Sequence, residues 1–446
     1  MGSFQDKITA AILTRIRSRR KSASVLAESH PRPGSAIAPA KLREARFSDF
    51  IAVAELKQRG GIAPDSLENW ERLWRRNPAL APGTVERPIG WVLEADGAVV
   101  GYLGNISLRC WYGDQALSAV TAHGFVVDPP YRAVGLSLAA AFFRQKSVDL
   151  YVSTSAIEAV GKIALAFKSA PLPQPDYDTV LFWVLQPYPF AQSLVTKLNL
   201  SPALSRIGTA VGALAISTDK ILRQRWPRSS ASSLAVSEIS PEQIGDDFQS
   251  LWAEKLRERP RLFAERTPAT LRWHFEIPGD IGLARVICCR QDGKLVGYAV
   301  VRSDTDPENG LRKSLIADLI ARQDDPAVLR ALWSAAYDYA KQAGSHVLEV
   351  QGFPPGVRQI FSDWKPYQRK LPACPYYYKA TDPLLQQTLA GAAAWYACPF
   401  DGDATLIRPS YSAPAGLATA EVPEKAAGEI LADLSPAAEQ ERTGVC

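Results

Sequence analysis

Apolar and polar positions alternate in two hairpin-like segments of the chain. Residues 91–108 read WVLEADGAVVGYLGNISL, and residues 286–303 read VICCRQDGKLVGYAVVRS. In each segment an Asp-Gly pair separates two strand-like runs, and glycine at that point accepts the positive φ of a tight hairpin turn. The two segments therefore predict two β-hairpins of the same design.

The flanks of the two hairpins repeat as well. Trp74 precedes the first hairpin and Trp273 the second, while Phe50 and Phe248 lie further upstream in acidic, helix-like stretches. Landmarks that recur in the same order at nearly equal spacing indicate an internal duplication. We therefore predict two tandem domains of one fold.

Each hairpin is followed by the same series of strand, helix, strand and helix. In the first copy we expect these elements at residues 116–127, 136–148, 149–155 and 157–169, and in the second at 314–322, 326–344, 345–353 and 357–364. An antiparallel front half with a helix that crosses to a parallel strand predicts an α+β fold. Each domain should hold a mixed, mostly antiparallel sheet flanked by helices.

The predicted organisation has five parts. They are a basic N-terminal arm (1–40), an N-terminal domain (41–225), a linker (226–239), a degenerate C-terminal domain (240–408) and a disordered acidic tail (409–446). The boundary follows from the Pro, Ser and Arg content of WPRSSASS at 226–233, which is typical of a linker. Residues 370–408 are expected to return and pack on one of the two sheets.

Composition places the chain among ordinary globular proteins, with 446 residues, 47% of them apolar and 22% charged. The net charge is +5, and residues 1–22 alone carry +5, so the rest of the chain sums to zero. A body without net charge does not favour nucleic-acid binding. The apolar residues of the arm recur at helical spacing, which predicts peripheral contact of residues 1–22 with an anionic membrane surface.

Cysteine and histidine usage points to a reducing compartment without a metal site. The six cysteines are scattered without a CxxC pair, and no two of the four histidines lie at ligand spacing. We therefore expect a cytoplasmic protein. Contact of the arm with lipid would place it on the inner face of the cytoplasmic membrane.

The strand-to-helix turn of the first copy has the composition of an anion site. Residues 126–137 read VVDPPYRAVGLS, with Arg132, Gly135 and Ser137 in the order Arg-x-x-Gly-x-Ser. Gly135 can turn without Cβ strain, and the amides of residues 133–137 are expected at a helix N-terminus, where backbone donors lack internal partners. A pyrophosphate could accept several of these hydrogen bonds together.

Residues 127–137 resemble the pyrophosphate signature of the GNAT superfamily of N-acetyltransferases. That signature is Gln or Arg, two residues, Gly, one residue, then Gly or Ala, usually after Val-x-Pro-x-Tyr; here Ser137 takes the final small position. The resemblance covers residues 41–185 well, and residues 240–408 resemble a second, degenerate copy. The tandem arrangement is similar to Fem-type peptidyltransferases, mycothiol synthase and paired acyltransferases encoded beside bacterial polysaccharide genes.

This resemblance implies an acyl-CoA-dependent N-acyltransferase that moves an acyl group, acetyl above all, from CoA to a primary amine. The acceptor would be a small molecule such as an amino sugar or aminoacyl compound of bacterial envelope or polysaccharide metabolism. The implied cofactor-binding residues are Phe125, Val126 and Val127 for the pantetheine arm, and Arg132, Ala133, Val134, Gly135, Leu136 and Ser137 for the pyrophosphate.

His123 and Glu158 are the candidate catalytic bases. His123 lies on the same strand, and an unperturbed imidazole, with a pKa near ~6.5, suits amine deprotonation; otherwise it is a hydrogen-bonded core residue. Glu158 begins the next helix, where it could also serve as a dipole partner. Ile157 stands where the family has Asn, and Phe167 is the nearest aromatic residue, so the tyrosine acid of the family is absent. Three possibilities remain. Another group protonates the leaving thiolate, the thiolate leaves without a proton donor, or this copy binds CoA without turnover.

The second copy departs from the signature. Residues 321–330 read ARQDDPAVLR, in which Asp324 or Asp325 would cap the helix and Pro326 would take its first turn. A carboxylate at the helix end and the lack of glycine predict that this copy does not bind CoA and instead helps to shape the acceptor cleft.

The sequence leaves more than one possibility open for the acceptor site and for the activity. Aromatic residues that either line a sugar or peptide cleft or pack in the core are Trp70, Trp74, Trp91, Trp111, Trp273, Tyr376, Tyr377 and Tyr378. The chain could also be a non-catalytic acyl-CoA-binding or scaffold protein, or a Fem-like aminoacyltransferase, which would require a positive groove for tRNA. The sequence does not determine acyl length or oligomeric state.

Overall fold

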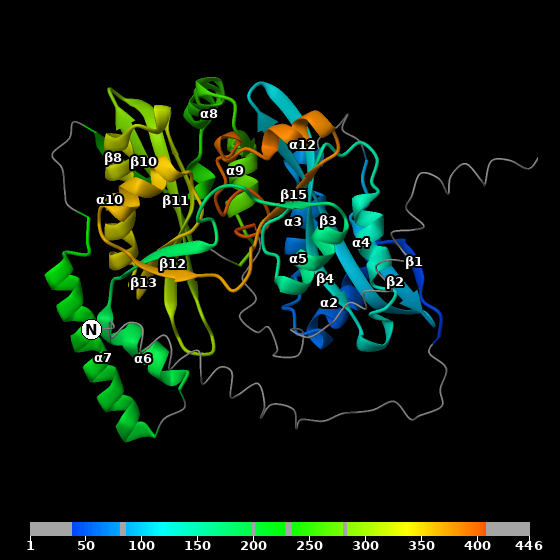
Figure 1. Cartoon of the computed structure of the whole chain (residues 1–446), viewed down its shortest axis with the longest axis horizontal. Helices are drawn as coiled ribbons and strands as arrows, with labels where there is room; N and C mark the ends of the chain where they lie inside the picture. Colours follow the sequence, from blue (N-terminus) through cyan, green and yellow to red (C-terminus); the bar gives the residue numbers. More distant parts are fainter. Residues whose placement is uncertain (1–37, 81–85, 199–200, 228–233, 280–282, 407–446) are drawn as a thin grey trace, which may run out of the picture.

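The computed structural model describes residues 38–80, 86–198, 201–227, 234–279 and 283–406, in which two β-sheets lie side by side (Figure 1). Sheet A has eight strands. Across the sheet they are β1 (Lys41–Glu44), β2 (Gly90–Ala95), β3 (Ala98–Tyr112), β4 (Gln115–Val127), β5 (Leu150–Ser153), β15 (Tyr377–Ala380) and β6 (Ala170–Pro171), and β9 (Leu262–Ala264) pairs with β3.

Sheet B has seven strands and the same mixture of pairings. In order they are β14 (Tyr367–Lys370), β7 (Thr179–Val184), β13 (Val347–Val350), β12 (Arg312–Ala321), β11 (Lys294–Thr305), β10 (Ala284–Gln291) and β8 (Ala235–Ile239). One parallel pair occurs in each sheet, β4 with β5 and β12 with β13, among antiparallel pairs. The predicted α+β class, with a mixed sheet in each half, is confirmed.

Helices lie on both faces of each sheet and at the edge of sheet B. They are α2 (Phe50–Arg59), α3 (Leu67–Trp74), α4 (Leu136–Phe143), α5 (Glu158–Ala166), α6 (Pro187–Thr196), α7 (Pro202–Arg223), α8 (Asp246–Glu258), α9 (Pro268–Phe275), α10 (Pro326–Gln342), α11 (Pro355–Ser362) and α12 (Pro383–Leu389). In sheet A, α2 and α3 pack on one face and α4 on the other. In sheet B, α8 and α10 pack on opposite faces of β11.

Both predicted hairpin turns are present. Asp96 and Gly97 join β2 to β3 with φ of 49° and 75°, and Asp292 and Gly293 join β10 to β11 with φ of 49° and 77°. Two successive positive φ values define the hairpin turn whose twist matches the flanking strands. The duplicated hairpins therefore sit at equivalent places in the two sheets.

The two sheets exchange strands. β7 comes from the first half of the sequence but pairs with β13 and β14 in sheet B, and β15 comes from the second half but pairs with β5 and β6 in sheet A. The predicted return of residues 370–408 to a sheet is confirmed by β15. The predicted domain limits do not describe this exchange, and residues 235–239 of the predicted linker form the edge strand β8.

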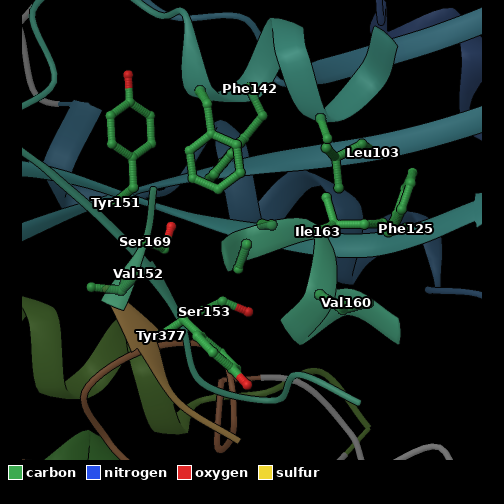
Figure 2. A pocket seen from close by; sticks show the side chains of 14 residues that line it. Leu103, Phe125, Phe142, Tyr151, Val152, Ser153, Val160, Ile163, Ser169 and Tyr377 are labelled. Carbon is green, nitrogen blue, oxygen red and sulfur yellow. The ribbon is translucent and has the colours of Figure 1, made fainter. Parts of the chain in front are cut away.

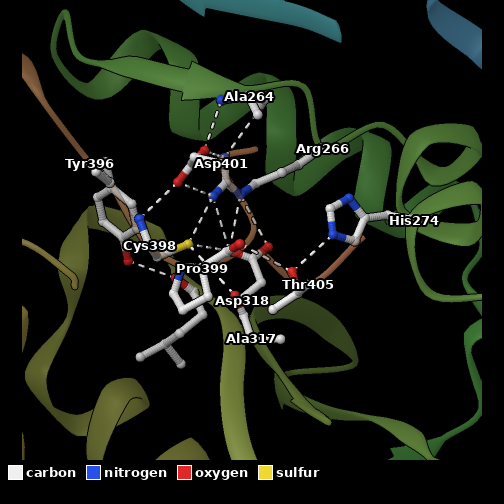
Figure 3. A network of polar contacts seen from close by, with 12 residues as sticks. Ala264, Arg266, His274, Ala317, Asp318, Tyr396, Cys398, Pro399, Asp401 and Thr405 are labelled. Carbon is white, nitrogen blue, oxygen red and sulfur yellow. Dashed lines mark hydrogen bonds and ion pairs between the residues drawn. The ribbon is translucent and has the colours of Figure 1, made fainter. Parts of the chain in front are cut away.

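A buried network of charged side chains ties the C-terminal residues to sheet B (Figure 3). Arg266 pairs with Asp318 at 3.0 Å and with Asp401 at 3.1 Å. The hydroxyl of Tyr298 donates to Asp318 at 2.7 Å, and the thiol of Cys398, whose pKa burial raises well above its usual range, lies within the same network. Because every charged member is buried, the network holds its segments together in one arrangement.

The predicted basic arm and acidic tail lie, except for residues 38–40, outside the described residues. Within the described ranges, the helices are too short or too polar to cross a membrane.

Candidate active site

β4 and β5 run parallel over a short distance and then separate. Residues 119–121 of β4 pair with residues 150–152 of β5, which ends at Ser153 while β4 continues to Val127. Beyond Thr121, no strand in the described part of the chain pairs with the edge of β4 that faces β5. Main-chain groups on this edge are therefore free to bind a ligand.

An apolar pocket lies where the two strands separate (Figure 2). It encloses about 480 Å³, part of it open to solvent, and its wall carries almost no polar surface. Its lining includes Phe125 of β4, Phe142 of α4, Ile163 of α5 and Tyr377 of β15. The pocket thus draws on both halves of the sequence.

A bulge in β4 turns Phe125 into this pocket. Gly124 and Phe125 together lie opposite one residue of β3, and Gly124 has φ of 65°. A bulge of this kind re-aims the side chains on either side of it. His123 consequently faces α2, while Phe125 faces the pocket on the other side of the sheet.

The predicted pantetheine-binding residues occupy the unpaired edge of β4. The side chain of Phe125 lines the pocket, that of Val126 is buried in the opposite core, and that of Val127 packs toward α4. Their main-chain role in binding stays a prediction.

The predicted phosphate turn lies at the surface, at the start of α4. Contrary to the expectation of unpartnered amides throughout residues 133–137, those of residues 134, 135 and 137 donate to carbonyls three positions earlier, at 3.0 to 3.2 Å. The chain winds through tight 3₁₀-like turns before α4, which satisfies these donors locally. In the described residues the amides of Ala133 and Leu136 make no hydrogen bond.

Gly135 serves close packing at this turn. Its φ of −61° is an ordinary helical value, so the expectation that glycine is needed for an unusual turn is wrong. A Cβ at this position would lie 3.0 Å from Cγ2 of Val127, closer than neighbouring carbons normally come. Glycine therefore lets the start of α4 sit against the end of β4. Arg132 and Ala133 are exposed beside it.

His123 lies in a buried cluster with a lysine and an aspartate. Its Nε2 is 3.0 Å from Nζ of Lys57 and 3.1 Å from Oδ2 of Asp65, and those two atoms are 2.5 Å apart. Burial acts to raise the pKa of Asp65, but its electrostatic interactions and hydrogen bonds with His123 and Lys57 outweigh burial and hold this pKa well below the usual range. The carboxylate therefore stays ionised and orients the imidazole.

Three buried polar atoms beside this cluster lack partners. They are Nδ1 of His123, the hydroxyl of Tyr102 and the hydroxyl of Thr121, which have no hydrogen-bond partner in the described structure. Thr121 and His123 are two positions apart on β4 and so share a face, and Tyr102 lies on the same side of β3. Buried polar groups are normally satisfied, so the lack of a partner at each of these atoms is unusual.

Glu158 is far more exposed than His123. Its side chain is 76% exposed and pairs with Lys162 at 3.3 Å in the first turn of α5. Glu158 is not among the residues that line the pocket, and within the described structure it makes no ion pair with His123. This placement fits the alternative role of a helix-dipole partner.

Tyr377 lines the pocket from β15, although its hydroxyl adds almost no polar surface to the wall. Ile157 precedes α5 at the surface, and Phe167 stacks on Phe143 with ring centroids 5.0 Å apart, so neither brings a polar group to the pocket. Tyr377 reaches the pocket from β15, and its hydroxyl lies beside Gly161 of α5 (Figure 2). Burial raises the pKa of this phenol above its usual range.

Strand alternation explains why only one of the successive tyrosines lies in the pocket. Tyr376 and Tyr378 face the core and are buried, so Tyr377 between them faces the other way. Four of the tryptophans proposed as cleft residues are likewise core residues, namely Trp70, Trp74, Trp91 and Trp273, whereas Trp111 is partly buried. Among the described residues no cluster of His, Cys, Asp and Glu could hold a metal ion.

The equivalent turn of the second copy is closed by carboxylates. Asp325 caps α10 by accepting hydrogen bonds from the amides of Ala327 at 2.7 Å and Val328 at 3.2 Å, as predicted. Asp324 pairs with the buried Lys255 at 2.6 Å. This helix end thus has its donors satisfied before any ligand arrives.

Comparisons with known proteins show structural similarity to solved proteins. No family model matches the sequence, and no curated protein matches it. A GCN5-related N-acetyltransferase from Anabaena variabilis is 9% identical with a TM-score of 0.49, over 77% of this chain and 73% of its own. One from Kribbella flavida is 12% identical with a TM-score of 0.47, over 78% and 72%.

The Saccharomyces cerevisiae N-myristoyltransferase, solved with bound myristoyl-CoA and inhibitors, is 12% identical with a TM-score of 0.48, over 78% of this chain and 82% of its own. These identities and TM-scores are too low to carry an argument on activity. The chain is similar in fold to structures described as N-acyltransferases, and its function has to be argued from its own residues.

Proposed function

We propose that the chain is an acyl-CoA-dependent N-acyltransferase whose site lies where β4 and β5 separate. The observation that carries the proposal is the unpaired edge of β4, which leads from the turn at residues 132–137, exposed at residues 132–134, into an apolar pocket. The pyrophosphate would bind the free amides of Ala133 and Leu136 together with Arg132. The pantetheine arm would follow the main chain of residues 125–127.

The reaction needs a base and an acid on either side of the thioester. The amine nitrogen attacks the thioester carbonyl carbon, the C–S bond breaks, and the amine loses a proton while the thiolate gains one. We assign the base to His123, whose Nδ1 is unpartnered and whose ring is held by Asp65. We assign the acid to Tyr377 on the pocket side.

The acceptor amine would enter from the face of sheet A that carries α2, where the unpartnered atoms of His123, Tyr102 and Thr121 lie. An amino sugar or aminoacyl compound would offer the hydroxyl and carbonyl groups that these atoms lack. The assignment to bacterial envelope or polysaccharide metabolism rests on the resemblance of the tandem arrangement alone.

A non-catalytic acyl-CoA-binding protein is the second candidate. Two features favour it: His123 is 5% exposed, and Nζ of Lys57 lies 3.0 Å from its Nε2, where it competes with Asp65 for the ring. Release of free thiol from acyl-CoA with a panel of primary amines separates the two candidates, because a binding protein releases none.

Calorimetric titration with acetyl-CoA and longer acyl-CoAs tests the phosphate turn. Ala133→Glu adds a carboxylate at an exposed position of the turn, and like-charge repulsion should weaken binding by about tenfold or more. Gly135→Glu should act in the same direction and also disturb the contact with Val127. Gly356→Glu is the matched control, because Gly356 lies in the first turn of α11 with open space around its Cβ position.

Circular dichroism spectra confirm that each variant is folded. Unchanged affinity of a folded Ala133→Glu variant would place the CoA site elsewhere.

A further inference from the structure

α6 and α7 form a helical hairpin that projects from the edge of sheet B (Figure 1, green). The side of α7 that faces away from the molecule carries Leu204, Ile207, Val211, Leu214 and Ile221, and we call these residues the outer face. Their exposed fractions run from 57% to 70%, and they are three, four, three and seven positions apart, so they lie on one side of the helix. Contiguous apolar surface of this kind marks an interaction site.

The hairpin is already packed by the opposite side of α7. Gly208 and Gly212 bring the two helices close, since a Cβ at these positions would lie 3.6 Å from Val195 and 3.4 Å from Ala191. Thr209 on that side is buried. The outer face therefore takes no part in holding the hairpin together.

The charge around the outer face is positive. Residues 187–226 contain five Lys or Arg and a single acid, Asp219, which is held by Arg225 at 2.7 Å. Lys197 and Arg223 are more than half exposed, although they pair with Asp306 at 3.8 Å and with Asp219 at 2.8 Å, and Arg206 is exposed between Leu204 and Ile207 in the sequence. An apolar stripe bordered by cations is the chemistry that binds an anionic lipid surface.

A second copy of the chain fits this surface less well. The three-and-four spacing would suit a helix–helix seam, but two hairpins would bring like charges together. Charge complementarity therefore favours lipid over a partner copy.

We propose that the outer face of α7 lies on the surface of an anionic phospholipid bilayer, with the hairpin in the plane of the interface. The apolar side chains would enter the boundary between headgroups and acyl chains, and Lys197, Arg206 and Arg223 would meet lipid phosphates. This surface is independent of the proposed acyltransferase site and does not rest on it.

Vesicle co-sedimentation of the full-length chain tests the proposal. Vesicles of phosphatidylcholine alone are compared with vesicles of equal parts phosphatidylcholine and phosphatidylglycerol. The wild type should bind the anionic vesicles, and the double variant Ile207→Gln/Leu214→Gln should bind them about tenfold or more weakly. Both positions are exposed, so folding should be unchanged, as thermal unfolding would confirm.

Leu67→Gln/Leu384→Gln is the matched control. These leucines are 55% and 70% exposed on α3 and α12, away from the hairpin, and the control should bind like the wild type. Because every protein keeps residues 1–22, a contribution of the N-terminal arm is common to all of them. Arg206→Gln should weaken binding to anionic vesicles only.

Two results would overturn the proposal. One is a double variant that binds anionic vesicles as well as the wild type. The other is light scattering that shows a lipid-free dimer which the double variant dissociates, because the outer face would then belong to a second copy of the chain.

Discussion

Asp65 pairs with Lys57 and His123 in a buried cluster on sheet A. The side chains of Lys57 and Asp65 are 1% and 10% exposed, so neither charge can be solvated if the other is removed. We predict that Asp65→Asn lowers the free energy of unfolding at neutral pH by about 3 to 5 kcal/mol, the usual cost of leaving a buried charge unpaired. Urea denaturation measures it.

Glu71→Gln is the control for this prediction, because Glu71 pairs with Arg75 at the surface and its loss should cost less than about 1 kcal/mol. Equal effects of the two substitutions would contradict the buried-charge argument.

The same aspartate makes stability depend on pH. Its pKa is lowered in the folded protein, mainly through His123 and Lys57 acting against burial. The folded state therefore binds fewer protons at this site than the unfolded state, whose carboxyl titrates near ~3.9. The stabilisation is fully present above that value and is lost as the pH falls. The difference between wild type and Asp65→Asn should accordingly shrink toward acid pH, in urea titrations over a pH series.

Single residues of the candidate site differ in how far the sequence reveals them. His123 stands out because histidine is rare in the chain and this one precedes the motif on its strand. Lys57 and Asp65 carry no such signal, since one sits in an ordinary amphipathic helix and the other in a connecting segment 58 residues away from His123. Which charges share a buried site is set by packing between elements.

At the scale of elements, the sequence pattern predicts individual strands and helices but does not predict which distant strands pair. The strand at residues 115–127 and the helix at 326–342 lie close to their predicted limits, because alternation, turn residues and caps act over a few positions. The partners of β7 and β15 were not predictable in this way. Alternation identifies a strand and its buried face, but does not say which edge the strand joins.

The exchange of β15 brings Tyr377 to the pocket, and the proposed role of this residue can be tested by substitution. If this residue donates a proton to the leaving thiolate, Tyr377→Phe should lower kcat for acyl transfer by about 10²-fold while acyl-CoA affinity stays near that of the wild type. Steady-state kinetics and calorimetric titration measure the two effects separately. Tyr339→Phe on α10 is the control, as it alters a partly buried tyrosine that packs against the core elsewhere.

An unchanged kcat for Tyr377→Phe would mean that water, and not Tyr377, protonates the leaving thiolate. A parallel loss of affinity and rate would instead make Tyr377 a residue that shapes the pocket.

At the scale of the molecule, the strand exchange makes each half depend on the other. Removing β7 would split β13 from β14 in sheet B and uncover the buried Trp333, whose ring lies 4.6 Å from that of Trp183 in β7. The C-terminal segment adds a second tie, because Asp403 accepts hydrogen bonds from Thr154 at 2.7 Å and Ser155 at 2.8 Å, just beyond β5. Two sheets joined in this way should unfold as one cooperative unit.

Arg266 offers the sharpest test of that cooperativity. Arg266→Met leaves Asp318 and Asp401 buried without a counter-charge, so we expect a loss of about 3 to 5 kcal/mol in the free energy of unfolding. Urea denaturation followed by tryptophan fluorescence and by far-ultraviolet circular dichroism should show coincident transitions in both proteins, shifted to lower urea in the variant. Arg369→Met, which removes an exposed pair with Glu349, should shift the transition little. Two separate transitions in the wild type, only one of which moves in Arg266→Met, would mean that the sheets fold independently despite the strands that they exchange.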